Sequence, residues 1–178
     1  MNADARLKRL FFALWPDAAL RSSLEPRIRA LQPDGVGRPQ RPDQWHVTLE
    51  FLGSVAGPRI DAAVEAAACV GGAPFEISLD AVEHWRRPAV LCLVARTNPP
   101  ALDEFVCSLR HELARQAFDC ERRPFRAHLT LARKVARPVA VPPFEPVCWP
   151  AREFALVESL TDRAGSRYVP LAQWPLAG

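Results

Sequence analysis

Residues 45–53 read WHVTLEFLG, and the word HVTL inside that stretch, residues 46–49, returns as HLTL at residues 128–131. The chain has only four histidines and four threonines in 178 residues. A chance repeat of the His-x-Thr spacing at that rarity has odds of roughly a few tenths of a per cent. The repeat therefore marks positions that the fold or the function requires.

Both words lie in apolar, β-prone runs that predict strands. Side chains alternate between the two faces of a strand, so His46 and Thr48 project together while the residues between them point to the opposite side. His128 and Thr130 repeat this arrangement in the second word. Each strand therefore offers one imidazole and one hydroxyl to a polar surface and aliphatic side chains to a core.

The rest of the chain alternates between helical and strand periodicity, with Pro- and Gly-rich segments between the elements. We expect strands at residues 7–15, 45–52, 75–82, 89–96, 128–132, 153–160 and 167–174. We expect helices at residues 18–31, 57–70 and 100–117. The expected connections include a loop at 32–42, a short link at 84–88, an extended Pro-rich segment at 137–150 and a closing turn at 162–165.

Each half of the chain places one His-x-Thr strand after a helix, and the two words stand nearly half the chain length apart. This order predicts an α+β fold of two pseudo-symmetric lobes, each with antiparallel sheet and helices, around a central cleft. No flexible linker separates the halves, so we expect residues 1–178 to form a single bilobal domain.

Composition excludes several classes of protein. Hydrophobic residues make up 49 % of the chain, yet no apolar run approaches the ~20 residues that span a bilayer, and no signal-like segment opens it. We expect a cytoplasmic monomer. The five cysteines are odd in number and contain no C-x-x-C pair, so neither a disulfide framework nor a zinc site is indicated.

The net charge is only +3, but arginine supplies almost all of the positive charge and gathers beside the two words. Such a cluster suits an anionic ligand, and a solvated surface run is the other interpretation. Its members are Arg38, Arg41, Arg122, Arg123, Arg126, Arg133, Lys134 and Arg137.

Two imidazoles on opposite walls of a cleft can transfer protons in a displacement at phosphorus: one takes a proton from the nucleophile and the other gives one to the leaving oxygen. The two threonine hydroxyls can donate to the non-bridging phosphate oxygens. This division of labour needs no metal and no cofactor. The chain also has no nucleophile-elbow G-x-S-x-G, P-loop or G-x-G-x-x-G motif.

The two words and their flanks, WHVTLEFLG at 45–53 and FRAHLTLAR at 125–133, resemble the two-histidine (2H) phosphoesterases. Within that superfamily the chain is most similar to the bacterial and archaeal RNA 2′,3′-cyclic phosphodiesterases, formerly named 2′-5′ RNA ligases. The resemblance also covers residues 9–14, 156–159 and 168–176, and so spans nearly the whole chain.

The resemblance implies a bilobal fold and an enzyme that hydrolyses a 2′,3′-cyclic phosphate at an RNA end to a 2′-phosphomonoester. By position, His46 would protonate the departing 3′ oxygen and His128 would activate water, although the symmetry of the words makes these roles exchangeable. Thr48 and Thr130 would hold the phosphate. Reversal of the same steps would give 2′-5′ ligase activity.

The fifth position after each histidine is Phe51 in one word and Arg133 in the other, and the family tends to place substrate contacts there. Phe51 would stack on the terminal base, with a core phenylalanine as the other interpretation. Arg133 would pair with phosphate, with a surface arginine as the other interpretation. His84 and His111 lack any matching context, so we assign them structural or surface roles.

Two alternatives share these residues. A 2H esterase acting on another cyclic phosphate, or on a 2′-5′ oligonucleotide, would keep every catalytic group. A non-catalytic nucleotide- or RNA-binding module would keep the arginines and aromatics but would tolerate loss of a histidine or threonine, and none is lost here.

Overall fold

The strands that carry the two words meet in the middle of one antiparallel sheet. The computed structural model describes residues 7–32, 34–162 and 165–177. Across these residues the sheet order is β10-β9-β1-β3-β7-β6-β5, with β2 also on β7, while β4 and β8 form a separate pair. The strands are β1 Lys8–Leu14, β2 Arg38–Pro39, β3 Val47–Val55, β4 Phe75–Leu79, β5 Ala81–Trp85, β6 Val90–Val94, β7 His128–Arg133, β8 Val147–Ala151, β9 Glu153–Asp162 and β10 Gly165–Pro175. The helices are α1 Ala18–Ala30, α2 Gly57–Ala68 and α3 Pro100–Arg115, with a 3₁₀ turn, η1, at Pro42–Gln44.

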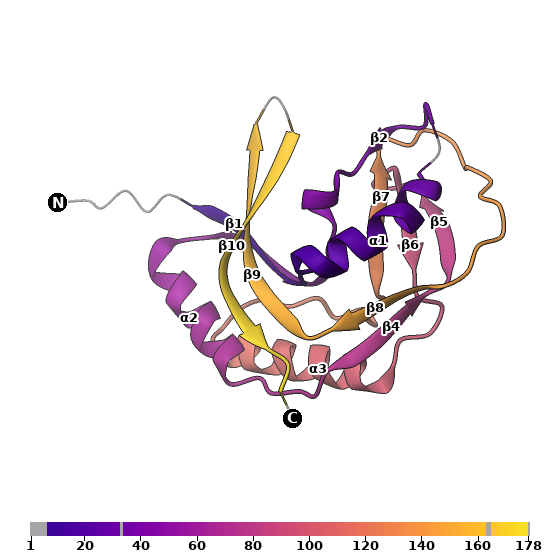
Figure 1. Cartoon of the computed structure of the whole chain (residues 1–178). Coiled ribbons are helices and arrows are strands. Elements are labelled where there is room, and N and C mark those ends of the chain that lie inside the picture. The colour runs from indigo at the N-terminus through magenta and orange to yellow at the C-terminus, as the bar shows by residue number, and fades with distance from the viewer. Residues whose placement is uncertain (1–6, 33, 163–164, 178) are drawn as a thin grey trace.

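The sheet divides into the two expected halves at the junction of β3 and β7. These strands pair through Val47 and Leu129. In Figure 1, β10, β9 and β1 lie on the left of that junction and β7, β6 and β5 on the right. The α+β class and the two-lobed arrangement are therefore confirmed, with a shared central sheet connecting the lobes.

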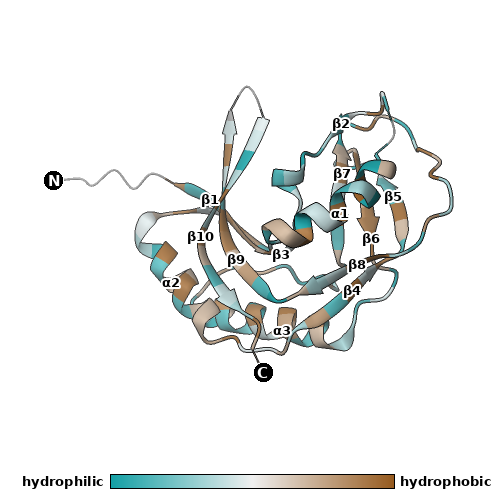
Figure 2. Ribbon diagram, viewed as in Figure 1, coloured by the Kyte–Doolittle hydropathy of each residue, from teal (hydrophilic) through white to brown (hydrophobic). Residues whose placement is uncertain are grey.

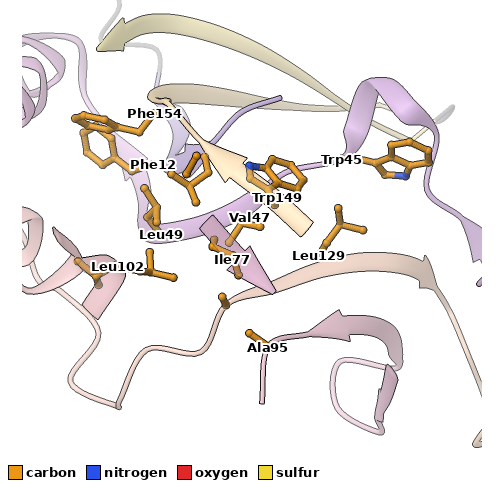
Figure 3. Packing of buried hydrophobic residues seen from close by; sticks show 14 of the residues in the cluster. Phe12, Trp45, Val47, Leu49, Ile77, Ala95, Leu102, Leu129, Trp149 and Phe154 are labelled. Atoms are coloured by element: carbon orange, nitrogen blue, oxygen red, sulfur yellow. The ribbon is translucent and has the colours of Figure 1, made fainter. Parts of the chain in front are cut away.

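The main hydrophobic core lies on the face of the sheet opposite the two histidines. Trp45, Val47 and Leu49 from the first word pack there with Leu129 from the second, all almost fully buried (Figure 3). The helices and the β4–β8 pair contribute the other side of this core. The neighbouring strand β6 differs, because all of its residues are apolar and buried, which means that both of its faces are covered (Figure 2). The predicted alternation of core and polar faces is thus confirmed for both words.

The predicted single strand at 75–82 is wrong, because the chain leaves one sheet for the other at Asp80. β4 ends at Leu79 and β5 begins at Ala81. Between them the Asp80 N–H donates to the Val94 carbonyl at 3.0 Å, and its carboxylate accepts the Arg96 N–H at 2.9 Å. These bonds fix the bend at Asp80, so an unbroken apolar run in the sequence becomes strands of two different sheets.

Two predicted connections are also shorter in the structure. β5 continues to Trp85 and so takes up part of the expected link at 84–88. The Pro-rich segment at 137–150 ends in β8, which contains Pro150. β8 has one paired neighbour, β4, within the described residues, and proline, which lacks an N–H, is tolerated in such an edge strand. Residue 33 of the predicted loop and residues 163–164 of the predicted closing turn lie outside the described residues.

The remaining predicted helices and strands are confirmed with end points that differ by a few residues. The loop expected at 32–42 holds the short strand β2 and the start of η1. Among the described residues, no helix has both the length and the apolar content needed to cross a bilayer.

Phe154 on β9 tests the importance of the core face. Its ring is fully buried and lies 4.9 Å from that of Phe105 and 5.1 Å from that of Trp174. We expect Phe154→Ala to lower the free energy of unfolding by about 3–5 kcal/mol in urea titrations, because it removes an aromatic side chain and leaves a cavity. Leu171→Ala on the neighbouring β10, where the leucine is 37 % exposed, is the control and should cost less than about 1 kcal/mol. Equal losses in the two variants would contradict this description of the core.

Candidate active site

His46 lies between η1 and β3, and a backbone carbonyl fixes one of its ring nitrogens. Its Nδ1 is 2.7 Å from the carbonyl oxygen of Gln44. Gln44 is itself held, because its side-chain amide donates to the Ser166 carbonyl at 2.6 Å and accepts the Arg41 N–H at 3.0 Å. In the neutral imidazole Nδ1 therefore carries the proton and donates it, and Nε2 remains the nitrogen that can exchange a proton with a bound molecule.

Aromatic rings surround the imidazole of His46. Trp15 stacks on it at 5.7 Å, and the rings of Phe11 and Tyr168 each lie 5.0 Å away. This burial lowers the pKa of His46 to about 4. The hydrogen bond to Gln44 opposes the shift, and the positive charge of Arg133 adds to it. His46 is consequently neutral at pH 7 in the free protein.

His128, at the start of β7, repeats this arrangement. Its Nδ1 is 2.9 Å from the carbonyl oxygen of Arg126, again two residues earlier in the chain. Trp85 packs against the ring at 4.7 Å. Burial lowers the pKa of His128; the bond to Arg126 opposes this, and the charges of Arg126 and Arg133 contribute to it. Both words therefore present an imidazole with the same tautomer and the same free nitrogen.

The carboxylate of Glu83 binds both residues that contact the ring of His128, namely Trp85 and Arg126. Glu83 accepts the indole N–H of Trp85 at 2.9 Å and receives two hydrogen bonds from Arg126, at 2.8 and 2.6 Å. These bonds hold the pKa of Glu83 below its usual value. The ring that packs on His128 and the residue whose carbonyl binds it are thus tied to the same side chain.

All six predicted site residues line one cavity of about 640 Å³. They are His46, Thr48, Phe51, His128, Thr130 and Arg133. The predicted convergence of the two words on one surface is therefore observed, and it brings two imidazoles and two hydroxyls together beside a guanidinium.

The two threonines differ in their surroundings. Thr48 is nearly buried, and Thr130 is hydrogen-bonded to the thiol of Cys92, which also lines the cavity. Burial raises the pKa of Cys92 to about 12, so the thiol stays protonated at pH 7. The Thr130 hydroxyl opposes this rise in pKa, which is the effect of a donor to the sulfur.

Neither Phe51 nor Arg133 matches the alternative that the sequence allowed, which was a core phenylalanine for the first and a surface arginine for the second. Phe51 is 59 % exposed and is not a core residue; its ring lies 5.9 Å from that of Phe11 at the cavity wall. Arg133 forms no ion pair within residues 7–32, 34–162 and 165–177, and its charge acts on both histidines. An aromatic face and a cation without a carboxylate partner in the described residues thus adjoin the imidazoles and hydroxyls of the two words.

Most of the predicted arginine cluster does not line this cavity. Apart from Arg133, only Arg123 of that cluster does so, while Arg122 and Arg126 line a neighbouring cavity. Arg41 pairs with Asp43 at 3.0 Å. The Nε2 of His84 lies 2.8 Å from the Val135 carbonyl, and His111 is exposed on α3. Neither of these two histidines lines a described cavity.

The sequence interpretation missed the residues that orient the histidines. No motif marks these residues: Trp15, Glu83, Trp85 and Tyr168 act through contacts between distant segments, and Gln44 acts through its backbone carbonyl, which its residue type does not reveal. Within the part of the chain that the structure describes, no group of three or more His, Cys, Asp or Glu side chains is arranged to hold a metal ion.

The sequence and the fold of this chain have counterparts among known proteins. A family model for LigT-like phosphoesterases matches residues 15–92. The RNA 2′,3′-cyclic phosphodiesterase of Escherichia coli K12 is 33 % identical over 171 residues, which cover 95 % of this chain and 97 % of that protein. The enzyme of the same name from Archaeoglobus fulgidus is 27 % identical over 127 residues, covering 70 % of this chain and 72 % of that one.

Solved structures agree with these matches. The crystal structure of E. coli LigT complexed with 3′-AMP has a TM-score of 0.85 and 32 % identity, and the match covers 97 % of this chain and 99 % of that one. Similarity of this degree over nearly the full length, in sequence and in structure, shows that the chain belongs to the LigT-like phosphoesterase family, as its two histidine words indicated.

Proposed function

We propose that this protein is an RNA 2′,3′-cyclic phosphodiesterase that hydrolyses a terminal 2′,3′-cyclic phosphate to a 2′-phosphomonoester. The observation that carries the proposal is the convergence of both His-x-Thr pairs on one cavity, with each imidazole held by a backbone carbonyl through Nδ1. The two relatives described above carry this activity in their names.

In the proposed reaction His128 Nε2 takes a proton from water, whose oxygen attacks phosphorus opposite the 3′ oxygen. The phosphorus–O3′ bond breaks, and His46 Nε2 gives its proton to O3′. The product keeps phosphate on O2′, and the two imidazoles return to their starting states by proton exchange with solvent. Because both steps use only imidazole nitrogens, we propose that hydrolysis needs neither metal nor cofactor.

The other cavity residues act on the charge of the phosphate. Thr48 and Thr130 donate to its non-bridging oxygens, and Arg133 stabilises the charge that builds up on them. Phe51 offers its exposed ring to the terminal base. The anion in turn favours the imidazolium form of His46, so substrate binding promotes protonation of a group that is neutral in the free enzyme.

If a 5′-hydroxyl takes the place of water in the same steps, its oxygen bonds to phosphorus, the phosphorus–O3′ bond breaks and a 2′-5′ linkage results, so a weak ligase activity is part of the proposal. A monomeric state and a cytoplasmic location stay predictions from the sequence.

Replacing either histidine with asparagine tests the proton transfers. An asparagine amide can still donate to the carbonyl that binds Nδ1, but it has no group in place of Nε2. We expect His46→Asn and His128→Asn each to lower kcat by about 10²- to 10⁴-fold on a short RNA with a cyclic phosphate end. The wild-type rate should be the same in EDTA, and phosphorus NMR should show a 2′-phosphate. Turnover by the wild type of other cyclic phosphates alone would favour a different 2H esterase, and ligand binding without turnover would favour a binding module.

Valine substitutions test the hydroxyls at nearly constant shape. Thr48→Val and Thr130→Val should each lower kcat by about 10²- to 10³-fold, because each removes one donor to the developing charge. Thr97→Val, at an exposed position outside the cavity, is the matched control and should leave kcat unchanged. A loss below threefold in both cavity variants would show that the threonines do not contact the phosphate.

The lowered histidine pKa values predict an acidic pH optimum. The rate rises as the base loses its proton and falls as the acid loses its proton, and burial places both pKa values below the usual 6.5. We therefore expect kcat/KM, which reports the free enzyme, to peak below pH 6.5, and kcat to peak at higher pH because bound phosphate favours imidazolium. Arg133→Gln should move both limbs of the kcat/KM profile to higher pH, because that charge lowers both pKa values. A kcat/KM maximum above pH 7 in the wild type would contradict the assigned burial.

A further inference from the structure

A second cavity, of about 750 Å³, continues directly from the catalytic one. The two cavities share five lining residues, which define the junction between them: Thr48, Phe51, Trp85, Arg123 and His128. Each cavity falls in the ~300–1,000 Å³ range of small-molecule sites. The surface beside the histidines therefore has room for two adjacent ligand groups.

The walls of the second cavity combine flat apolar groups with cations. Phe51, Trp85 and Phe125 line it together with Pro124, and Arg122, Arg123 and Arg126 line it from the segment that precedes β7. Aromatic faces suit nucleobases of any identity, and arginine suits phosphate. Phe51 is one of the few large hydrophobic side chains exposed in the described residues, and it forms part of both cavities.

Buried hydrogen bonds hold the arginine-bearing wall in place. Glu50, which is 3 % exposed and follows Thr48 by two residues on β3, accepts the Arg110 Nε at 2.6 Å and the Glu121 N–H at 2.9 Å. Arg110 also donates to the Arg123 carbonyl at 3.0 Å. The strand that supplies Thr48 thus also anchors the segment that carries Arg122 and Arg123.

Arg123 occupies the junction of the two cavities, and its side chain is 84 % exposed. Two of its nitrogens pair with Glu121, which lowers the pKa of that carboxyl to about 2 and leaves the remaining guanidinium nitrogen for a ligand. Arg122 makes no ion pair within the described residues. Among the carboxylates that line this cavity, Glu50 pairs with Arg110 and Glu121 pairs with Arg123, while the exposed Asp119 has no ion pair within the described residues. A ligand at the junction therefore meets the Arg123 guanidinium together with its Glu121 partner.

An RNA that ends in a cyclic phosphate can leave the catalytic cavity only through the 5′ oxygen of its terminal nucleotide. We propose that the second cavity is a subsite for the next nucleotide on the 5′ side, with its base on the aromatic wall and the linking phosphate at Arg123. The enzyme then prefers oligonucleotide ends to free nucleoside 2′,3′-cyclic phosphates. This inference rests on the proposed function.

Steady-state kinetics on a matched pair of substrates test the subsite: a nucleoside 2′,3′-cyclic phosphate and the dinucleotide with the same terminal residue. We expect the wild type to favour the dinucleotide in kcat/KM by tenfold or more. Arg123→Ala should reduce that ratio by about tenfold, and Arg122→Ala should reduce it less. Arg27→Ala, which removes an exposed charge from α1 and lines neither cavity, should leave the ratio unchanged.

The salt dependence of binding gives a second readout that general damage to the fold would not mimic. In the inactive His128→Asn variant, the affinity for the dinucleotide should fall more steeply with salt than that for the mononucleotide, by about 0.7 in logarithmic slope for one added phosphate contact. Adding Arg123→Ala should remove that difference.

The outcomes separate the inference from the proposed function. Equal kcat/KM for the two wild-type substrates, or equal losses on both in Arg123→Ala, would overturn the subsite while leaving the phosphodiesterase activity in place. Absence of wild-type turnover on both substrates would instead overturn the proposed function, and the subsite with it.

Discussion

The pairing of β3 with β7 through Val47 and Leu129 is the constraint on which the site depends. It places two strands from distant parts of the chain next to each other at the centre of the sheet. Because side chains alternate along a strand, the residues that flank this pair, His46 and Thr48 on one strand and His128 and Thr130 on the other, all project to the face away from the core. A register shift of one residue in either strand would turn its imidazole into the core.

The electrostatics of the site follow from the same geometry. The face away from the main core has its own smaller apolar clusters, one around Phe11 and Ala155 beneath His46 and one around Cys92 and Val94 near His128. These clusters desolvate the imidazoles and keep them uncharged. Arg133 meanwhile supplies a positive charge that disfavours imidazolium until an anion arrives. In the proposed reaction, phosphate binding and protonation of His46 are therefore coupled, and each stabilises the other.

The sequence predicted the parts of this structure that local patterns encode. The His-x-Thr alternation identified the polar face, and apolar periodicity located the three helices and most of the strands. The prediction of one strand at 75–82 was wrong because an apolar run does not reveal that Asp80 binds Val94 at the end of β6 and Arg96 just after it. β8 was missed because the prolines of the 137–150 segment favour a loop, whereas Pro150 lies in an edge strand, a position that tolerates proline.

Only some residues of the candidate site could likewise be predicted from the sequence. The histidines and threonines of the two words could be named from the internal repeat, and Phe51 and Arg133 from the substrate contacts that the resembled family places at the same offset from each histidine. Tyr168 and Trp85 could not, because each contacts a histidine from a separate part of the chain, and Glu83 could not, because it acts through Trp85 and Arg126. The second cavity was equally invisible in the sequence, since Glu50 and Arg110 meet only after β3 and α3 have packed together.

The carbonyls that bind the two Nδ1 atoms belong to the backbone, and every amino acid carries that acceptor. The tautomer of each imidazole is thus specified by chain geometry and not by a partner side chain, so substitutions at positions 44 and 126 can leave the acceptor in place as long as the strand entry keeps its shape. A pair of histidines oriented in this way requires no particular amino acid at the two positions that supply the carbonyls. That economy is consistent with the retention of one architecture while about two thirds of the sequence differs from the E. coli relative.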